Sequence, residues 1–397
     1  MAITGAHGGA ERPGLMSSDR RPLFEIWPQL EPELGFQPLG DFPTPIEPLA
    51  RLVPELGSAA GESYVKRDDQ SSPVYGGNKV RTLEPLLGHA RRQGRRSVLA
   101  TGAYGSNHAV ATVLHAERAG FRSGVMLFPQ PFSETAMANL RVSITHADSV
   151  TDVLHWSTLP LAIWRARRQA SPGRDALIMP PGGAIPRGCL GFMSAGLELG
   201  MQIERGLLPP PAEIILALGS TCSTAGLLVG LRLAVRLGLG FKGGAAGSAP
   251  PLLVAVRVTP WPVTSAFRIL NLARRLSTWL LELSRDPLFD IERAELGRGL
   301  EVDGAHLGAG YGRPSAAGLA AIERLRPFSA ALDTTYSAKS AAALLHRISL
   351  AKPCTRLFWS TKSLVPLPVV PLANLRQAPP RMRRWLERGA LAVPEHY

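Results

Sequence analysis

Short apolar stretches with strand character alternate with longer stretches of helical spacing along most of this chain of 397 residues. One block of alternation runs from Ser97 to Met179, and a second runs from Gly191 to Ser360. Alternating β and α units form parallel sheets with helices on their faces, because each connection must pack back onto the sheet. The pattern therefore predicts an α/β protein with two open parallel-sheet domains.

The alternation also gives approximate element bounds. The first block predicts strands Ser97–Ala103, Gly124–Phe128 and Ala176–Met179, and helices Ser106–Ala119, Glu134–Thr145 and Leu154–Gln169. The second predicts strands Glu213–Leu218, Leu252–Val258, Glu301–Val302 and Arg356–Ser360, and helices Gly191–Arg205, Thr224–Leu237, Ala266–Leu283, Ser315–Leu325 and Ser337–Ile348. Outside the blocks we expect an extended entry at Pro43–Leu49, a strand at Ser63–Arg67 and a peripheral helix at Arg381–Glu387. Two domains suit this length, a larger one of residues 1–84 and 190–397 and a smaller one of 85–189.

The chain carries a formal net charge of +13, which taken alone would suit a nucleic-acid partner. Arginines supply most of that charge, and they are scattered without any zinc-finger, RNP or basic-zipper pattern. We therefore expect no nucleic-acid partner. The positive field would also attract an anionic substrate or cofactor.

Three cysteines without CxxC spacing cannot build a disulfide framework, which favours a reducing cytoplasm. Residues Met1 to Arg21 lack the apolar core of a signal peptide and are expected to form a disordered arm. The uncharged run Ile214–Leu231 is long enough to suggest a membrane span, but the small polar residues Gly219–Thr224 at its centre indicate strand, turn and helix instead. We expect no membrane partner, and we expect a loop at Gly243–Pro251.

Lys79 follows Gly76 and Gly77, which would let the backbone approach a ligand closely. Apolar positions from Val80 onward fall at helical spacing, and Asn78 is a plausible N-cap. A cation in the first turn of a helix opposes the helix dipole, which favours the neutral amine that attacks a carbonyl. The alternative is an ordinary solvated lysine.

The segment Tyr75–Glu84, followed by Gly105-Ser106-Asn107-His108, resembles the family of pyridoxal-phosphate enzymes that contains D-cysteine desulfhydrase and 1-aminocyclopropane-1-carboxylate deaminase. The resemblance covers roughly Pro43 to Pro368. It implies the fold-type-II, tryptophan synthase beta-like fold, with pyridoxal 5'-phosphate held between two α/β domains. It also implies that Lys79 binds the cofactor covalently, that no metal is used, and that the protein is a homodimer acting on a small amino acid.

Residues Gly219–Gly226 follow an apolar strand and open a predicted helix, so that unpaired backbone N–H groups would face a phosphate. By the resemblance, the phosphate is bound by Ser220, Thr221, Cys222 and Ser223, although an ordinary turn between strand and helix has the same pattern. Relatives commonly have glycine in place of Thr221 and Cys222. A positive φ at either would cost about 1 to 3 kcal/mol.

Ser106 and Asn107 begin a predicted helix, where either side chain could be the N-cap. In relatives the matching serine approaches the substrate carboxylate or the lysine, and the matching asparagine hydrogen-bonds the ring hydroxyl of the cofactor. His108 is a candidate proton carrier, although a histidine at a helix start is often only a polar contact.

The segments Gly310–Pro314 and Leu332–Ser340 resemble the two tyrosine motifs of the family. The resemblance implies that Tyr311 and Tyr336 are acid/base groups facing the substrate, whereas a lone tyrosine is usually a packing residue. To act as a base at neutral pH, a phenol needs its pKa lowered by roughly 3 units, which a nearby cation could supply.

Ser337 occupies the place of the family's partner for the ring nitrogen, and it could also merely cap the helix that it begins. A hydroxyl leaves that nitrogen largely unprotonated, whereas the glutamate of the deaminase relatives would hold it protonated. The segment Trp359–Ser363 replaces the His-Thr-Gly-Gly of many relatives, so the lid over the cofactor is expected to differ.

These residues predict a pyridoxal-phosphate-dependent lyase, similar to D-cysteine desulfhydrase, that eliminates the β-substituent of a small amino acid and releases pyruvate and ammonia. One alternative is a 1-aminocyclopropane-1-carboxylate deaminase. A non-catalytic regulatory protein that binds pyridoxal phosphate is the other, because Thr221, Cys222 and Lys362 depart from the family pattern.

Overall fold

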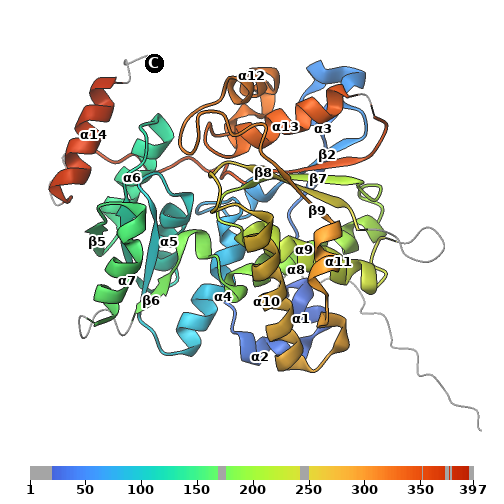
Figure 1. Ribbon diagram of the computed structural model, residues 1–397, viewed down its shortest axis with the longest axis horizontal. Coiled ribbons are helices and arrows are strands. Elements are labelled where there is room, and N and C mark those ends of the chain that lie inside the picture. Colours follow the sequence, from blue (N-terminus) through green and yellow to red (C-terminus); the bar gives the residue numbers. More distant parts are fainter. Residues whose placement is uncertain are drawn as a thin grey trace, which may run out of the picture.

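The computed structural model describes residues 20–168, 176–241, 250–350, 352–371, 375 and 378–392. Within these residues the strands form two open sheets, each covered by helices (Figure 1). The larger has the order β1 (Ile46–Pro48), β2 (Ser63–Lys66), β10 (Arg356–Trp359), β7 (Glu213–Leu218), β8 (Leu252–Arg257) and β9 (Leu300–Asp303). The smaller has the order β5 (Ser149–Asp152), β4 (Arg122–Phe128), β3 (Ser97–Ala103) and β6 (Ala176–Met179). All neighbouring pairs are parallel except β1 and β2, so the predicted pair of parallel sheets is confirmed with one antiparallel edge.

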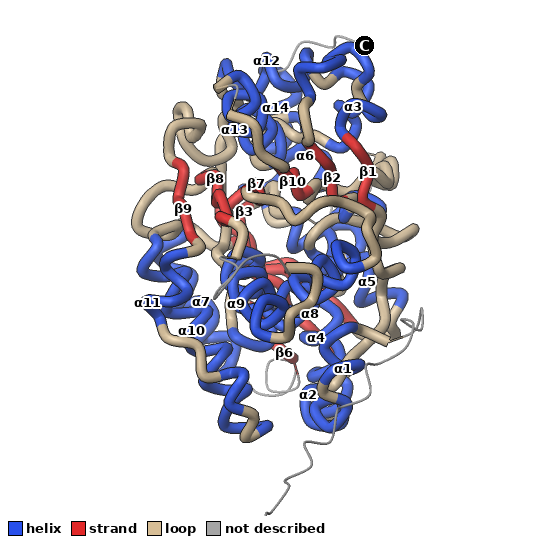
Figure 2. The backbone as a smooth tube through the Cα atoms, turned by 90° about the vertical axis from the view of Figure 1, so that its right-hand side faces the viewer, coloured by secondary structure: helices blue, strands red, loops and turns tan. Residues whose placement is uncertain are grey.

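Most of the helices lie in the connections between strands. They are α1 (Pro22–Ile26), α2 (Glu31–Leu34), α3 (Leu49–Leu52), α4 (Lys79–Arg92), α5 (Asn107–Arg118), α6 (Glu134–His146), α7 (Leu159–Arg168), α8 (Pro186–Glu204), α9 (Cys222–Arg236), α10 (Ala266–Ser284), α11 (Arg293–Arg298), α12 (Ala316–Arg324), α13 (Ser337–Ser349) and α14 (Pro380–Ala392). Helices α4, α8 and α9 lie side by side (Figure 2). This packing brings together the start of α4, which carries Lys79, and the start of α9, which follows β7.

The larger sheet is buried on both faces because alternate residues of its central strands enter different cores. Leu216 of β7 and Leu253 of β8 join the core beneath α8, α9 and α10. Ile215 and Val254, their neighbours in sequence, join the core beneath α12 and α13. This arrangement explains why β7 and β8 are continuous apolar runs, as parallel strands covered on both faces usually are.

Two predicted helix starts are wrong, and one strand was missed. The helix predicted at Leu154–Gln169 begins only at Leu159, because a 3-10 turn over Trp156–Thr158 precedes it, and its last predicted residue lies outside the described part. Strand β5, just before it, was not predicted, since its polar residues at a half-exposed edge carry no apolar run. The helix predicted from Gly191 begins at Pro186, a residue favoured at the first helical position.

The prediction of a disordered arm over residues 1–21 is wrong at its last residue. Arg21 is buried, and its guanidinium pairs with Glu84 of α4. The remainder of that predicted arm, up to Asp19, and the predicted loop at 243–249 lie outside the described residues. The proposed domain boundaries at 84/85 and 189/190 remain predictions, and both fall within helices, α4 and α8.

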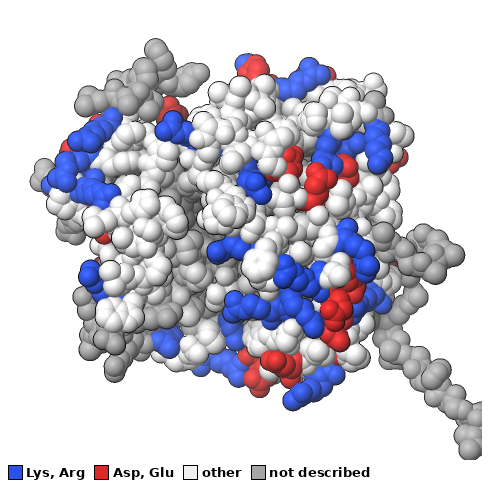
Figure 3. Space-filling view, viewed as in Figure 1, with Lys and Arg blue, Asp and Glu red and all other residues white. Residues whose placement is uncertain are grey.

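The basic residues do not form one stripe on the face shown in Figure 3, where blue side chains are dispersed and several lie beside acidic ones. Among the described residues, no helix combines the length and the apolar character needed to cross a membrane. The uncharged run that raised the question is divided between β7 and α9, as predicted.

A buried network of charges joins α4 and α8 to the larger sheet. Arg81 of α4 lies 2.8 Å from both Asp68 and Glu198, and Lys66 of β2 also pairs with Glu198. Trp359 of β10 donates to Asp68 at 2.8 Å. Burial alone would raise the pKa of Glu198, but Arg81 and Lys66 outweigh burial and lower that pKa to about 2.

We expect Glu198→Gln to destabilise the fold by about 3 to 5 kcal/mol, because Lys66 would keep a buried charge without its carboxylate partner and Arg81 would keep only Asp68. Glu31→Gln, which breaks an exposed pair with Arg20, should cost less than about 1 kcal/mol. Urea unfolding measures both. The wild-type contribution from Glu198 should be complete above its ordinary pKa of 4.5 and be lost as the pH falls toward 2, since the folded-state pKa is the lower one. Equal losses for the two variants would show that the network does not hold the helices to the sheet.

Candidate active site

The two glycines before Lys79 are required by neighbouring backbone. A Cβ on Gly76 would lie 2.4 Å from Asp69 O, and one on Gly77 would lie 2.6 Å from Thr361 O. Gly77 also has a φ of 89°, which side chains rarely adopt. These glycines therefore allow close packing of the protein on itself, and the expected approach to a ligand is not what requires them.

Lys79 is the first residue of α4, as predicted, but Asn78 does not cap the helix with its side chain. The Asn78 amide instead donates to the Ser223 hydroxyl at 3.1 Å, which ties the start of α4 to the start of α9. Burial lowers the pKa of the Lys79 amine, and Cys222 and Cys189 partly offset this effect. The neutral amine is thus favoured, as predicted, with desolvation as the main cause.

The segment Gly182-Gly183, which was not singled out from the sequence, lies against Lys79. A Cβ on Gly182 would be 2.1 Å from Ser220 Oγ and 3.7 Å from Lys79 Nζ. Gly183 is equally restricted, since its Cβ would lie 2.5 Å from a methyl carbon of Thr82. The sequence Gly182-Gly183 therefore lets this backbone lie close to the Lys79 amine, to Ser220 in the turn before α9 and to Thr82 of α4.

The turn before α9 has the geometry expected of a phosphate cradle. Ala225 is the first helix residue to donate its backbone N–H back into the turn, to Thr221 O at 2.9 Å, so the N–H groups of residues 222–224 lack intrahelical acceptors. Thr221 has a φ of 71°, and Arg285 is the only other non-glycine with a positive φ in the described residues. The strain anticipated at Thr221 is confirmed, whereas Cys222 is helical.

Ser106 caps α5, because its hydroxyl accepts from Ala109 N at 3.2 Å. The carbonyl oxygen of the Asn107 side chain accepts from the Asn139 amide at 2.7 Å and from the Tyr75 hydroxyl at 3.4 Å. Tyr75 was not singled out from the sequence, although it precedes the glycine pair. Its place beside Asn107 links the segment before α4 to the start of α5.

His108 is buried, and neither of its ring nitrogens has a hydrogen-bond partner among the described residues. Burial lowers its pKa to about 3, and the nearby charge of Lys79 lowers it further. The imidazole is therefore neutral at physiological pH. A neutral ring with two free nitrogens beside Lys79 indicates a site made for a polar group that the protein itself does not supply.

The side chains of Tyr311 and Tyr336 meet, and their hydroxyl oxygens lie 2.7 Å apart. The ring of Tyr336 lies over Gly219, where a Cβ would be 2.9 Å from its Cε1 atom. The lowering of the phenol pKa that a base at neutral pH would need is not found. Burial raises the pKa of Tyr311 to about 12, and that of Tyr336 is also raised by burial and then by Tyr311. Both phenols are therefore proton donors at neutral pH.

Ser337 does not cap α13, because Asp333 accepts from the backbone N–H groups of Thr335 and Tyr336. The Ser337 hydroxyl instead donates to Asp333 Oδ2 at 3.0 Å and accepts from Asp333 N at 2.7 Å. A carboxylate thus lies one hydrogen bond behind the serine, which sequence reasoning missed although Asp333 is in the same motif.

The site residues from separate parts of the chain form one group. Part of the predicted set is partly exposed to solvent, namely Lys79, Asn107, Ser220, Tyr311 and Tyr336. The rest is buried, namely Ser106, Thr221, Cys222, Ser223 and Ser337. The desolvated lysine, the N–H groups at the start of α9 and the unpartnered imidazole fit a cofactor that carries an aldehyde, a phosphate and polar ring groups. The residues present therefore fit pyridoxal phosphate.

Comparison with known proteins agrees with this fit. A model of the family described as "Pyridoxal-phosphate dependent enzyme" matches residues 38–352. Nocardicin C-9' epimerase of Nocardia uniformis subsp. tsuyamanensis is 34% identical over 318 residues, 79% of this chain and 90% of that protein. D-cysteine desulfhydrase of Salmonella paratyphi C is 29% identical over 323 residues, 77% of this chain and 86% of that protein.

Among solved structures, the crystal structure of an ACC deaminase homologue superposes with a TM-score of 0.67. It covers 86% of this chain and 94% of the other, at 23% identity. At that identity the likeness shows a shared fold.

Proposed function

The chain belongs to the pyridoxal-phosphate-dependent enzymes of the D-cysteine desulfhydrase and 1-aminocyclopropane-1-carboxylate deaminase family, with their fold-type-II architecture, and on that premise we propose that it eliminates the β-substituent of a small amino acid. The products are pyruvate and ammonia. The observation that carries the proposal is the Lys79 amine, which is desolvated and lies near Gly182 and the turn that contains Ser220.

In this proposal Lys79 binds the cofactor and then, as a neutral amine, removes the Cα proton of the substrate. Residues 220–223 hold the phosphate, and Asn107 faces the ring hydroxyl. When bound, pyridoxal phosphate withdraws electrons from Cα and so stabilises the loss of a bond there. Ser106, at the start of α5, binds the substrate carboxylate in this proposal.

Tyr311 and Tyr336 deliver a proton to the departing group in this proposal. Their raised pKa values support this role, since both phenols are protonated at neutral pH. Ser337 is the proposed partner of the ring nitrogen. Its hydroxyl proton points to Asp333, so the bond to the nitrogen requires that proton to turn from the carboxylate to the ring.

A substrate comparison tests the proposal. Opening a cyclopropane ring offers no good anionic leaving group and needs a protonated ring nitrogen, which a serine does not supply. Thiolate or chloride is a better leaving group than the carbon of the cyclopropane ring. We therefore expect pyruvate from D-cysteine and β-chloro-D-alanine, slower release from the L enantiomers, and little or no 2-oxobutyrate from 1-aminocyclopropane-1-carboxylate. Faster 2-oxobutyrate than pyruvate formation would overturn the argument from Ser337.

A second candidate is epimerisation at Cα, because the epimerase relative is 34% identical along 90% of its own length. Both activities begin with removal of the Cα proton, and they differ in whether a proton returns on the opposite face. The protonated pair Tyr311 and Tyr336 could return it. In D₂O, epimerisation gives a deuterated, inverted amino acid without pyruvate, whereas elimination gives pyruvate.

The proposal includes a cytoplasmic homodimer. A light-scattering mass of about twice the 42.5 kDa of one chain supports it, and a mass near 42.5 kDa at micromolar concentration contradicts it.

A further inference from the structure

Two of the three cysteines meet beneath the proposed phosphate cradle. Cys189 lies in the first turn of α8 and Cys222 is the first residue of α9, and their sulfur atoms are 3.8 Å apart. Both residues are completely buried. Helices α8 and α9 are held close at this point, because a Cβ on Gly226 would lie 2.3 Å from Cys189 O. The two thiols are therefore fixed as neighbours.

The pair also adjoins the groups that face the cofactor. The Cys222 thiol donates to Gly183 O at 3.2 Å, and Gly183 follows the glycine that separates Lys79 from Ser220. The third cysteine, Cys354, is partly exposed and lies in the segment before β10. It therefore provides an internal control for thiol chemistry.

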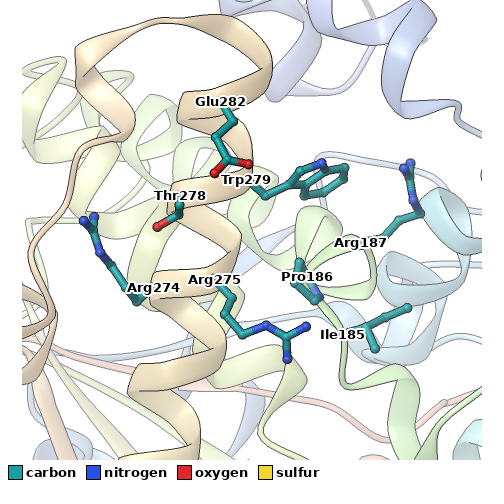
Figure 4. Close-up of a pocket in the computed structure, with 8 residues that line it drawn as sticks. All are labelled: Ile185, Pro186, Arg187, Arg274, Arg275, Thr278, Trp279 and Glu282. Atoms are coloured by element: carbon teal, nitrogen blue, oxygen red, sulfur yellow. The ribbon is translucent and has the colours of Figure 1, made fainter.

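The two sulfurs have different environments. The hydrogen bond from Cys189 lowers the pKa of Cys222, and Lys79 lowers it further although burial opposes both. Burial raises the pKa of Cys189, and the charge of Arg275 partly opposes this rise. Arg275 lines a groove of about 500 Å³ between α10 and the start of α8, and its guanidinium extends toward Pro186 (Figure 4). Cys222 is thus the better nucleophile, and Cys189 the partner placed to react with it.

We propose that Cys189 and Cys222 are a site of oxidative modification, at which a peroxide converts the two thiols into a disulfide that weakens cofactor binding. The proposal rests on the proposed placement of the cofactor phosphate at residues 220–223. It assigns the pair a role outside the catalytic steps described above.

The reaction balances with the peroxide as oxidant. The Cys222 sulfur attacks one peroxide oxygen, the O–O bond breaks, and the departing oxygen leaves as water after protonation. The Cys189 sulfur then attacks the Cys222 sulfur, the S–O bond breaks, and a second water forms with the proton of the Cys189 thiol. Two thiols and one hydrogen peroxide thus give one disulfide and two water molecules.

The disulfide alters the cradle because its sulfurs are about 2.05 Å apart, so they must approach each other by roughly 1.8 Å. The Cys222 thiol also loses the hydrogen that it donates to Gly183 O. Cys222 directly follows the strained Thr221, and its backbone N–H is one of the donors proposed to face the phosphate. Displacing Cys222 therefore misaligns the donors of the cradle.

Bound cofactor should slow the oxidation of the cysteine pair by peroxide, and oxidation should weaken cofactor binding. Peroxide is close to water in size, and a phosphate bound at residues 220–223 would cover the side of Cys222 that faces Lys79. Because binding linkage is reciprocal, a disulfide that weakens cofactor binding must itself be disfavoured by bound cofactor. We expect cofactor-loaded protein to be oxidised more slowly than cofactor-stripped protein.

The test treats the full chain, stripped or loaded, with hydrogen peroxide. Titration of the denatured chain should show three thiols falling to one, and peptide mass spectrometry should show a Cys189–Cys222 cross-link lighter by two hydrogens. The dissociation constant for pyridoxal phosphate, read from a spectroscopic titration, should rise about tenfold or more and recover with dithiothreitol.

Two variants sharpen the test. Cys354→Ser should retain the cross-link and the change in affinity, whereas Cys189→Ala should lose both the cross-link and the recovery of affinity with dithiothreitol. Oxidation confined to Cys354, or a cross-link without a change in affinity, would overturn the proposal. If the reduced protein binds no cofactor, the proposed function fails. The cross-link can still be measured on cofactor-free protein, and that measurement shows by itself whether the two thiols react.

Discussion

Replacing Lys79 with alanine is expected to lower turnover by at least about 10⁴-fold and to remove the visible absorption band of the bound cofactor. The reason is that one amine both binds the cofactor covalently and takes the Cα proton, so its removal eliminates a catalytic group that acts twice. A spectrum and a steady-state rate measure the two effects. Unfolding by urea should be little changed, because Lys79 takes no part in the buried network around Arg81.

Lys79→Arg is the matched control for this variant, since it retains a cation at the start of α4 but cannot form the covalent bond. It should be as inactive as Lys79→Ala. A Lys79→Arg enzyme with substantial activity would show that charge alone suffices and would contradict the role assigned to the amine.

Tyr311→Phe and Tyr336→Phe are each expected to lower turnover by about 10² to 10⁴, the range for a general acid or base, while cofactor binding is retained. The two hydroxyls are 2.7 Å apart, so removing either also leaves the other without its partner. Because both phenols have raised pKa values, they should remain protonated donors through neutral pH.

Steady-state rates and a cofactor titration check the tyrosine prediction. Tyr64→Phe, on the strand β2 of the larger sheet, removes a phenol hydroxyl far in sequence from both motifs and should retain wild-type rates. Near-normal rates for both Tyr311→Phe and Tyr336→Phe would identify them as packing residues.

Strands buried on both faces could be predicted from sequence, because a short continuous apolar run bounded by turn residues is typical of a buried parallel strand. Strand β7 lies at its predicted bounds, between a proline-rich segment and Gly219. Strand β5 could not be found, since a short edge strand of polar residues has no such run. The start of α8 was predicted at Gly191, whereas the helix begins at Pro186, a residue type that suits the first position of a helix.

The individual site residues were predictable where a motif fixed them, as at Lys79 and the turn before α9. Their contacts were not. The contact between the sulfurs of Cys189 and Cys222 depends on how α8 packs on α9. A single sequence contains no signal for the distance between these two sulfurs. The same holds for Asp333 behind Ser337, where the helix start turns the hydroxyl toward the carboxylate. The direction of the two phenol pKa shifts could not be predicted, because the burial of both rings could not be foreseen.

The proposed chemistry depends on the amine of Lys79. Because the chain contains six lysines, the lysine that binds the cofactor can be identified directly. Borohydride reduction of the protein loaded with pyridoxal phosphate fixes the cofactor to the lysine that binds it, and peptide mass spectrometry then identifies that lysine. The account predicts the added mass on Lys79 and loss of the visible band. Stoichiometric modification of another lysine, such as Lys339 or Lys362, with Lys79 unmodified would contradict it.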